Sequence, residues 1–132
     1  MVKNLLKSGK IIYPKKLILK KNLNVGIIGS GIIANEYAKI ISSFGHKLII
    51  IISKSNNRNA KNIAKKHKAK IFSNIKNIDK NLTVHAWIVC TSWNKLDYYL
   101  KYFLKSQTPI LIEKGIALSS KKIFNLFLKN KK

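Results

Sequence analysis

Short apolar runs recur along the chain from residue 24 onward, separated by polar and amphipathic stretches. Each run is two to five residues long and rich in Ile and Val, which is typical of buried parallel strands. The runs are Val25–Ile28, Leu48–Ile52, Ile71–Phe72, Ala86–Cys90 and Ile110–Ile112. The pattern therefore predicts five buried strands.

Apolar residues at helical spacing lie between and after these runs. The first stripe comprises Ile33, Tyr37, Ile40, Ile41 and Phe44, and Gly45 follows where a helix would end. Three further stripes have similar spacing: Ala60, Ile63, Ala64 and His67; Leu96, Tyr99, Leu100, Phe103 and Leu104; Ile123, Phe124, Phe127 and Leu128. Because strands and helices alternate, we predict an α/β fold with a doubly wound, Rossmann-like parallel sheet.

The length of 132 residues suits one domain. Residues 1–22 hold seven lysines and no acid, so we interpret them as a basic N-terminal extension and residues 23–132 as the domain. The longest apolar run has five residues, and the N-terminus lacks the apolar stretch of a secretory signal, so no membrane segment is expected. The single cysteine, Cys90, cannot form an intrachain disulfide, which fits a cytoplasmic protein.

The formal net charge of +23 first suggests a nucleic-acid binder. However, the basic residues are 26 lysines and one arginine, and the sequence also has 22 Ile and 14 Asn. Lys, Ile and Asn are all read from A/T-rich codons. Recognition of bases favours the planar arginine fork, and no segment interleaves aromatic and basic residues as a stacking surface does. We interpret the charge as a solvated, compositionally biased surface. Three isolated histidines likewise predict no metal site.

A glycine-rich turn follows the first predicted strand. Gly29-Ser30-Gly31-Ile32-Ile33-Ala34 has the G-x-G-x-x-A spacing of a dinucleotide-binding turn, and a predicted helix follows it. The first glycine permits the tight turn, the second lets a pyrophosphate approach the backbone, and the helix N-terminus offers free N–H groups. The sequence thus predicts a dinucleotide site at this turn, although a ligand-free glycine turn fits the same spacing.

The dinucleotide fingerprint normally includes an acid about twenty residues further on, which binds the adenosine ribose. Here the second strand ends in Ser53-Lys54-Ser55-Asn56, with Arg58 close behind and no carboxylate. Hydroxyl and cationic groups suit a 2′-phosphate, so the predicted cofactor is NAD(P), with NADP favoured over NAD. The same residues also fit a site that has lost its cofactor.

Two later segments strengthen the assignment. Cys90-Thr91-Ser92-Trp93-Asn94 follows the fourth strand, and Glu113-Lys114-Gly115 follows the fifth. Together with the glycine turn, they resemble the N-terminal domain of the Gfo/Idh/MocA oxidoreductases, whose landmarks are the turn, a T-P-N-like segment and an E-K-P motif. The resemblance covers residues 23 to about 130.

The resemblance implies roles for particular residues. Lys114 would lie near the nicotinamide and the substrate hydroxyl as the catalytic lysine, and Glu113 would share that cofactor site. Thr91 and Ser92 would line the ribose and nicotinamide. The pyrophosphate turn would comprise Gly29, Gly31, Ile32 and Ile33. The chain departs from the family at Gly115, which replaces the proline, and at Leu96, where a histidine is common and beside which Asp97 lies.

The family's second, substrate-binding domain is absent from this sequence. We therefore expect an NAD(P)-binding domain that depends on another chain, or a truncated enzyme, for hydride transfer on a sugar-like or other small hydroxy or carbonyl substrate. An oligomer is compatible with this prediction. Two alternatives stay open: a non-catalytic Rossmann module that senses a nucleotide or binds a partner at the sheet edge, and a lysine-driven nucleic-acid binder.

Overall fold

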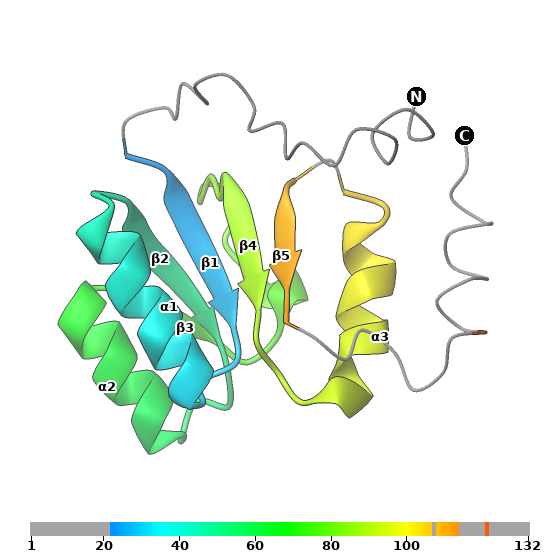
Figure 1. Cartoon of the computed structure of the whole chain (residues 1–132), viewed down its shortest axis with the longest axis horizontal. Coiled ribbons are helices and arrows are strands. Elements are labelled where there is room, and N and C mark those ends of the chain that lie inside the picture. Colours follow the sequence, from blue (N-terminus) through cyan, green and yellow to red (C-terminus); the bar gives the residue numbers. More distant parts are fainter. Residues whose placement is uncertain (1–21, 107, 114–120, 122–132) are drawn as a thin grey trace, which may run out of the picture.

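The computed structural model describes residues 22–106, 108–113 and 121, and its five strands form one parallel sheet (Figure 1). The strands are β1 (Asn24–Ile28), β2 (Lys47–Ile52), β3 (Lys70–Phe72), β4 (Ala86–Val89) and β5 (Ile110–Ile112). Their order in the sheet is β3-β2-β1-β4-β5, so the chain reverses direction across the sheet between β1 and β4. This confirms the predicted doubly wound sheet and all five strands.

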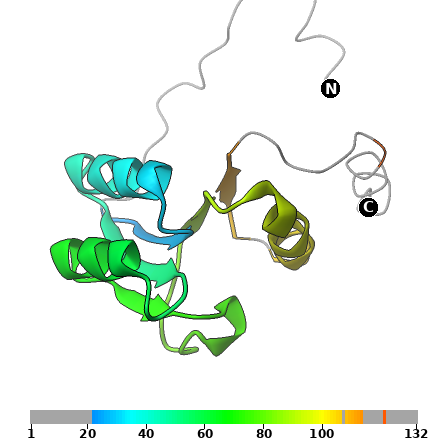
Figure 2. The same cartoon turned by 90° about the horizontal axis from the view of Figure 1, so that it is seen from below.

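The helices cover both faces of the sheet. Helices α1 (Ile32–Ser43) and α2 (Arg58–His67) lie on one face, and α3 (Trp93–Phe103) lies on the other, with the short 3-10 helix η2 (Ile75–Asn77) beside it (Figure 2). This arrangement is what right-handed crossovers on either side of the switch between β1 and β4 require.

Local sequence signals explain where the helices begin and end. The Asn57 side chain accepts a hydrogen bond of 3.0 Å from the backbone N–H of Ala60 and so caps α2. Gly45 follows α1 in the left-handed region, with φ of 76°, as its predicted position after a helix requires. The helix-ending glycine is therefore confirmed.

The predicted apolar stripe of α1 is wrong in part. Ile33, Ile40 and Phe44 are 49%, 47% and 71% exposed. The face that packs on the sheet instead comprises Ala34, Ala38 and Ile41. These three also have i, i+4, i+7 spacing, and alanine side chains let the helix axis approach the strands closely, so the smaller residues form the buried face.

The other stripes that fall in the described residues are closer to the prediction. Ala60, Ile63 and Ala64 are buried on α2, and Leu96 and Phe103 are buried on α3. Leu104 lies beyond the end of α3 and is 38% exposed. The fourth stripe, residues 123–128, and residues 1–21 of the predicted extension lie outside the described residues.

The sheet separates two apolar clusters. Ile27 and Ile51 pack with the buried residues of α1 and α2, while Ile50 and Val89 pack with those of α3. All four side chains are at most 1% exposed. Within the part of the chain that is described, no helix has the length and apolar character needed to cross a membrane.

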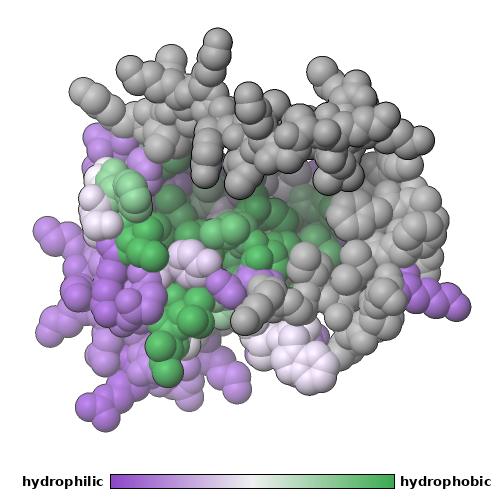
Figure 3. Space-filling view, viewed as in Figure 1, coloured by the Kyte–Doolittle hydropathy of each residue, from purple (hydrophilic) through white to green (hydrophobic). Residues whose placement is uncertain are grey.

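A further apolar hollow lies beside α1, at the amino ends of β1, β4 and β5. It measures about 450 Å³ and includes Ile40, Phe44, Ile88 and Leu111 in its lining. Figure 3, viewed as in Figure 1, shows hydrophobic side chains at the centre of the molecule and hydrophilic ones on the side of α1 and α2. The hollow is at the opposite edge of the sheet from the glycine turn, so it does not belong to the predicted cofactor site.

The buried ring of Trp87 restricts the residue beside it on β1. Gly26 pairs with Trp87 across the sheet, and a Cβ on Gly26 would overlap the six-membered ring of the tryptophan. Trp87 is 5% exposed and packs on Phe103, with ring centroids 5.8 Å apart, so it has little room to move. A glycine is therefore required here by packing.

We expect Gly26→Ala to lower the free energy of unfolding by roughly 1–3 kcal/mol, because the added methyl overpacks the core. Urea denaturation followed by circular dichroism measures the change. Gly31→Ala is the matched control, since a Cβ on Gly31 meets no atom within 4 Å. Equal unfolding curves for wild type and Gly26→Ala would contradict this packing.

Candidate functional site: the cleft at the carboxyl edge of the sheet

The glycine turn follows β1 and lies against the carboxyl end of β4. The Gly29 N–H donates to the Ile52 carbonyl at 3.0 Å, and the Cys90 N–H donates to the Ile28 carbonyl at 2.9 Å. Gly29 has φ of +112°, and a Cβ there would overlap the Cys90 carbonyl oxygen. Both the left-handed backbone and the contact with β4 therefore require glycine.

Gly31 differs from Gly29, because the fold itself does not require it. It is the N-cap residue of α1 with φ of −77°, which any residue can adopt, and a Cβ there would project into open space. Among the described residues no side chain caps this end of α1, so its first N–H groups are open to a ligand. The missing side chain leaves room for a ligand at the positive end of the helix dipole.

A cleft of about 440 Å³ opens from this turn across the ends of β2 and β4. Of the sequence-predicted residues, it brings together Gly29, Gly31, Ser53, Lys54, Thr91 and Ser92. The Ser30 and Ser53 hydroxyls are hydrogen-bonded at 2.9 Å, which ties the glycine turn to the end of β2. Arg58 begins α2 and is exposed, but it is not part of the lining.

Sequence reasoning missed several residues of the cleft. Asn57 and Ser73 line it from the loops after β2 and β3, while Lys95 and Tyr99 line it from α3. The two α3 residues are four positions apart and so share one face of that helix, a spacing that could have indicated them. No carboxylate is among the described residues of the lining, whereas Lys54 and Lys95 both contribute cations.

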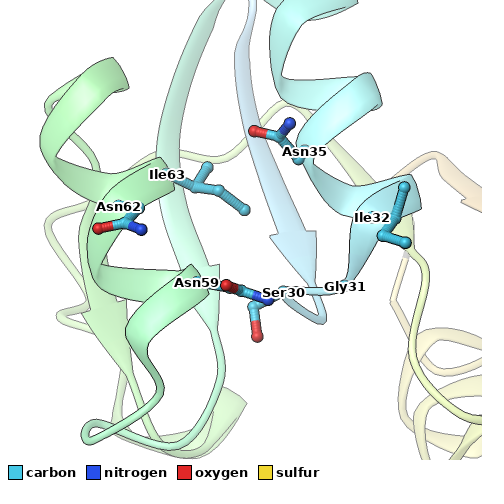
Figure 4. Close-up of a pocket in the computed structure, with 7 residues that line it drawn as sticks. All are labelled: Ser30, Gly31, Ile32, Asn35, Asn59, Asn62 and Ile63. Carbon is cyan, nitrogen blue, oxygen red and sulfur yellow. The ribbon is translucent and has the colours of Figure 1, made fainter.

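A smaller hollow of about 280 Å³ lies between α1 and α2 and shares Ser30 and Gly31 with the cleft. Figure 4 shows Asn35 pointing from α1 toward α2, and Asn59 beside Ser30. Ile32, predicted to belong to the pyrophosphate turn, lines this hollow rather than the cleft and is 81% exposed. Ile33 lines neither space.

The carboxyl end of β5 contributes Glu113. Its N–H donates to the Val89 carbonyl at 3.1 Å, and its carboxylate accepts a 2.7 Å hydrogen bond from the Tyr37 hydroxyl on α1. This bond raises the pKa of Tyr37, because an ionised phenol could no longer donate to the carboxylate. Tyr37 and Glu113 are 76 residues apart, so no local sequence signal predicts their contact. Lys114 lies outside the described residues.

Cys90 directly follows β4, lines the cleft and lies near Glu113. Burial and the nearby charge of Glu113 raise the pKa of its thiol to about 12. A thiol with this pKa stays protonated at neutral pH and is therefore a poor nucleophile. Cys90 forms part of the cleft wall.

The histidines have structural hydrogen bonds. His85 Nδ1 accepts from the Asn24 N–H at 2.8 Å, and His46 Nδ1 accepts from the Leu23 N–H at 3.3 Å. His67 Nδ1 lies 2.9 Å from the Ser42 hydroxyl. Within residues 22–106 and 108–113, no three His, Cys, Asp or Glu side chains come together as a metal site would require.

A family model described as an oxidoreductase family with an NAD-binding Rossmann fold, Gfo/Idh/MocA, matches residues 23–132. This range contains both the glycine turn and the Glu113 end of β5. No curated protein matches the chain in sequence.

Solved structures of dehydrogenases have a similar fold. A myo-inositol dehydrogenase from Corynebacterium glutamicum aligns with a TM-score of 0.73 and 16% identity, over 83% of this chain and 33% of that one. A myo-inositol dehydrogenase from Lactobacillus casei, in complex with NAD(H) and myo-inositol, has a TM-score of 0.71 and 15% identity over 82% and 33%. The WlbA dehydrogenase from Bordetella pertussis, in complex with NADH and UDP-GlcNAcA, has a TM-score of 0.71 and 16% identity over 84% and 33%. At these identities the likeness establishes the fold alone, and the chain spans about a third of each relative.

We expect the Cys90 thiol of the folded protein to resist iodoacetamide at pH 8, because a pKa of about 12 leaves roughly one thiolate in ten thousand. Mass spectrometry of the intact protein measures the labelled fraction over one hour. The same protein in 6 M guanidinium chloride is the control and should label fully. Labelling of the folded protein at the unfolded rate would show that Cys90 is neither buried nor near a negative charge.

Proposed function

The chain belongs to the Gfo/Idh/MocA oxidoreductase family through its NAD-binding Rossmann domain, and on this premise we propose that its cleft binds a nicotinamide dinucleotide for hydride transfer. The proposed substrate is a sugar-like or other small molecule with a hydroxyl or carbonyl group. When bound, the dinucleotide would supply the hydride donor or acceptor.

The observation that carries the proposal is the open space at Gly31. Packing explains why glycine occupies position 29, whereas no atom of the described residues comes within 4 Å of a Cβ at position 31. A pyrophosphate that approaches the first N–H groups of α1 gives the physical reason, since a Cβ would stand between the two. The basic, carboxylate-free lining of the cleft also suits a dinucleotide, which carries at least two negative charges.

The adenosine end of the dinucleotide is proposed to lie near the end of β2. Ser53 and Lys54 line the cleft there, and Arg58 begins the following helix. These groups would donate to a 2′-phosphate, and no carboxylate of the lining would repel it, which supports a preference for NADP. Thr91 and Ser92 are proposed to line the ribose and nicotinamide at the end of β4.

The catalytic proposal rests on the family motif. Lys114 follows Glu113 at the end of β5, and we propose that its ammonium stabilises a developing alkoxide or relays a proton. Because the chain covers about a third of its structural relatives, we propose that the substrate-binding residues come from polypeptide outside this domain, in the same or an associated chain. A cytoplasmic location is proposed because the sequence has a single cysteine, Cys90, which cannot form an intrachain disulfide.

Gly31→Ala should raise the Kd for NADPH at least tenfold, because the methyl group occupies the space proposed for the pyrophosphate. Gly31→Asp should raise it further by adding a negative charge. Nicotinamide fluorescence on titration with NADPH and NADH measures binding, while urea denaturation should show less than about 1 kcal/mol of lost stability for Gly31→Ala.

Asn59→Ala is the control for this experiment, since Asn59 lines the hollow between α1 and α2 and not the cleft. It should bind NADPH like the wild type. Failure of the wild-type protein to bind NADPH or NADH saturably would overturn the proposed function. Wild-type affinity in both Gly31 variants would place the site elsewhere.

The NADP preference has its own test. Ser53→Asp places a carboxylate at the end of β2, where it would repel a 2′-phosphate and accept from a 2′-hydroxyl. We expect the ratio of Kd for NADH to Kd for NADPH to fall roughly tenfold. Lys54→Gln should lower the ratio in the same direction, whereas Lys61→Gln, an exposed change on α2, should leave it unchanged. A wild-type protein that binds NADH more tightly than NADPH would contradict the preference.

A further inference from the structure

One carboxylate of the described chain is held in an unusual way. Glu36 pairs with Lys39, and Asp97 pairs with Lys101, both on exposed helix surfaces, while Asp79 accepts from a backbone N–H in a surface turn. Glu113 is half-buried, and its hydrogen-bonding partner is the hydroxyl of Tyr37.

The identity of the partner matters for the charge. A lysine beside a carboxylate cancels most of its field, whereas a neutral phenol fixes the carboxylate in position and leaves the negative charge in place. Among the described residues, two of the four carboxylates pair with lysines and Asp79 accepts from a backbone N–H, whereas Glu113 accepts from a neutral side chain. Glu113 lies beside the cleft, because its N–H donates to the Val89 carbonyl at 3.1 Å and the next residue, Cys90, lines that cleft.

The position of Glu113 in the sheet indicates what this charge would face. In a doubly wound sheet the dinucleotide lies across the switch point, with the adenosine ribose at the end of β2. The nicotinamide then lies on the other half, toward the ends of β4 and β5, and Glu113 directly follows β5. The oxidised nicotinamide ring carries one positive charge and the reduced ring carries none. A fixed negative charge nearby therefore attracts the two forms unequally.

We propose that Tyr37 is a positioning residue of the nicotinamide end of the cleft, where it holds the Glu113 carboxylate so that the site binds the oxidised cofactor preferentially over the reduced one. This inference rests on the proposed dinucleotide function and adds to it a determinant of redox-state selectivity. Tyr37 acts only through Glu113, and its own hydroxyl is directed at that carboxylate.

Glu113→Gln is the most direct test, because the amide oxygen of the introduced glutamine can still accept from Tyr37 while the charge is lost. We expect the ratio of Kd for NADPH to Kd for NADP+ to fall roughly fivefold, mainly through weaker binding of NADP+. Isothermal titration calorimetry at one pH and low ionic strength measures both constants. Tyr37→Phe keeps the charge but releases the carboxylate, so the ratio should fall by a smaller factor of about two to three.

The double variant separates positioning from simple loss of packing. Because Tyr37 acts through Glu113, adding Tyr37→Phe to Glu113→Gln should leave the ratio at the value of Glu113→Gln alone. Tyr98→Phe on exposed α3 and Glu36→Gln on exposed α1 are matched controls for the lost hydroxyl and the lost charge, and both should leave the ratio unchanged.

An unchanged ratio in Glu113→Gln, or a further fall in the double variant, would overturn the proposal. If Tyr37→Phe does not fold, the Glu113→Gln ratio still tests the charge of Glu113, without which Tyr37 has no role in this scheme. A chain that binds neither NADP+ nor NADPH contradicts the proposed function itself. A chain that binds both forms equally well in every variant contradicts only the role of Tyr37 and Glu113.

Discussion

The close approach of the β1 and β4 ends is the constraint on which the cleft depends. Gly29 lies against the Cys90 carbonyl, and only a residue without a Cβ can turn there with a positive φ. That contact sets where α1 begins, and hence where its free N–H groups point. It also brings Thr91 and Ser92 opposite the glycine turn, so the two walls of the cleft follow from one backbone contact.

The electrostatics of the molecule divide into a diffuse part and a localised part. Most of the +23 charge is carried by lysines on a solvated surface, where salt screens it. At the cleft the charges are localised: Lys54 and Lys95 belong to its lining, whereas Glu113 follows β5 outside that lining, and its carboxylate accepts from Tyr37.

The strands and the turn could be predicted because each is encoded locally. A run of β-branched residues forms a buried strand in any doubly wound sheet, and the GxGxxA spacing connects strand to helix within six residues. The α1 stripe shows where this reasoning fails. Two faces of that helix have apolar residues at helical spacing, and the prediction took the face with the larger side chains. The short distance between helix and sheet favours the face with the smaller ones. Ala34 and Ala38 pack there because they are small.

By itself, the sequence determined the fold class, the order of elements, the family and the position of the glycine turn, since these depend on periodicity and short spacings. Only the tertiary structure decided that Ile32 and Ile33 lie outside the cleft, that Lys95 and Tyr99 line it, and that Tyr37 reaches Glu113. The physical reason is the parallel sheet. It brings the carboxyl ends of all strands to one edge, so residues tens of positions apart become neighbours. No local sequence pattern predicts these contacts.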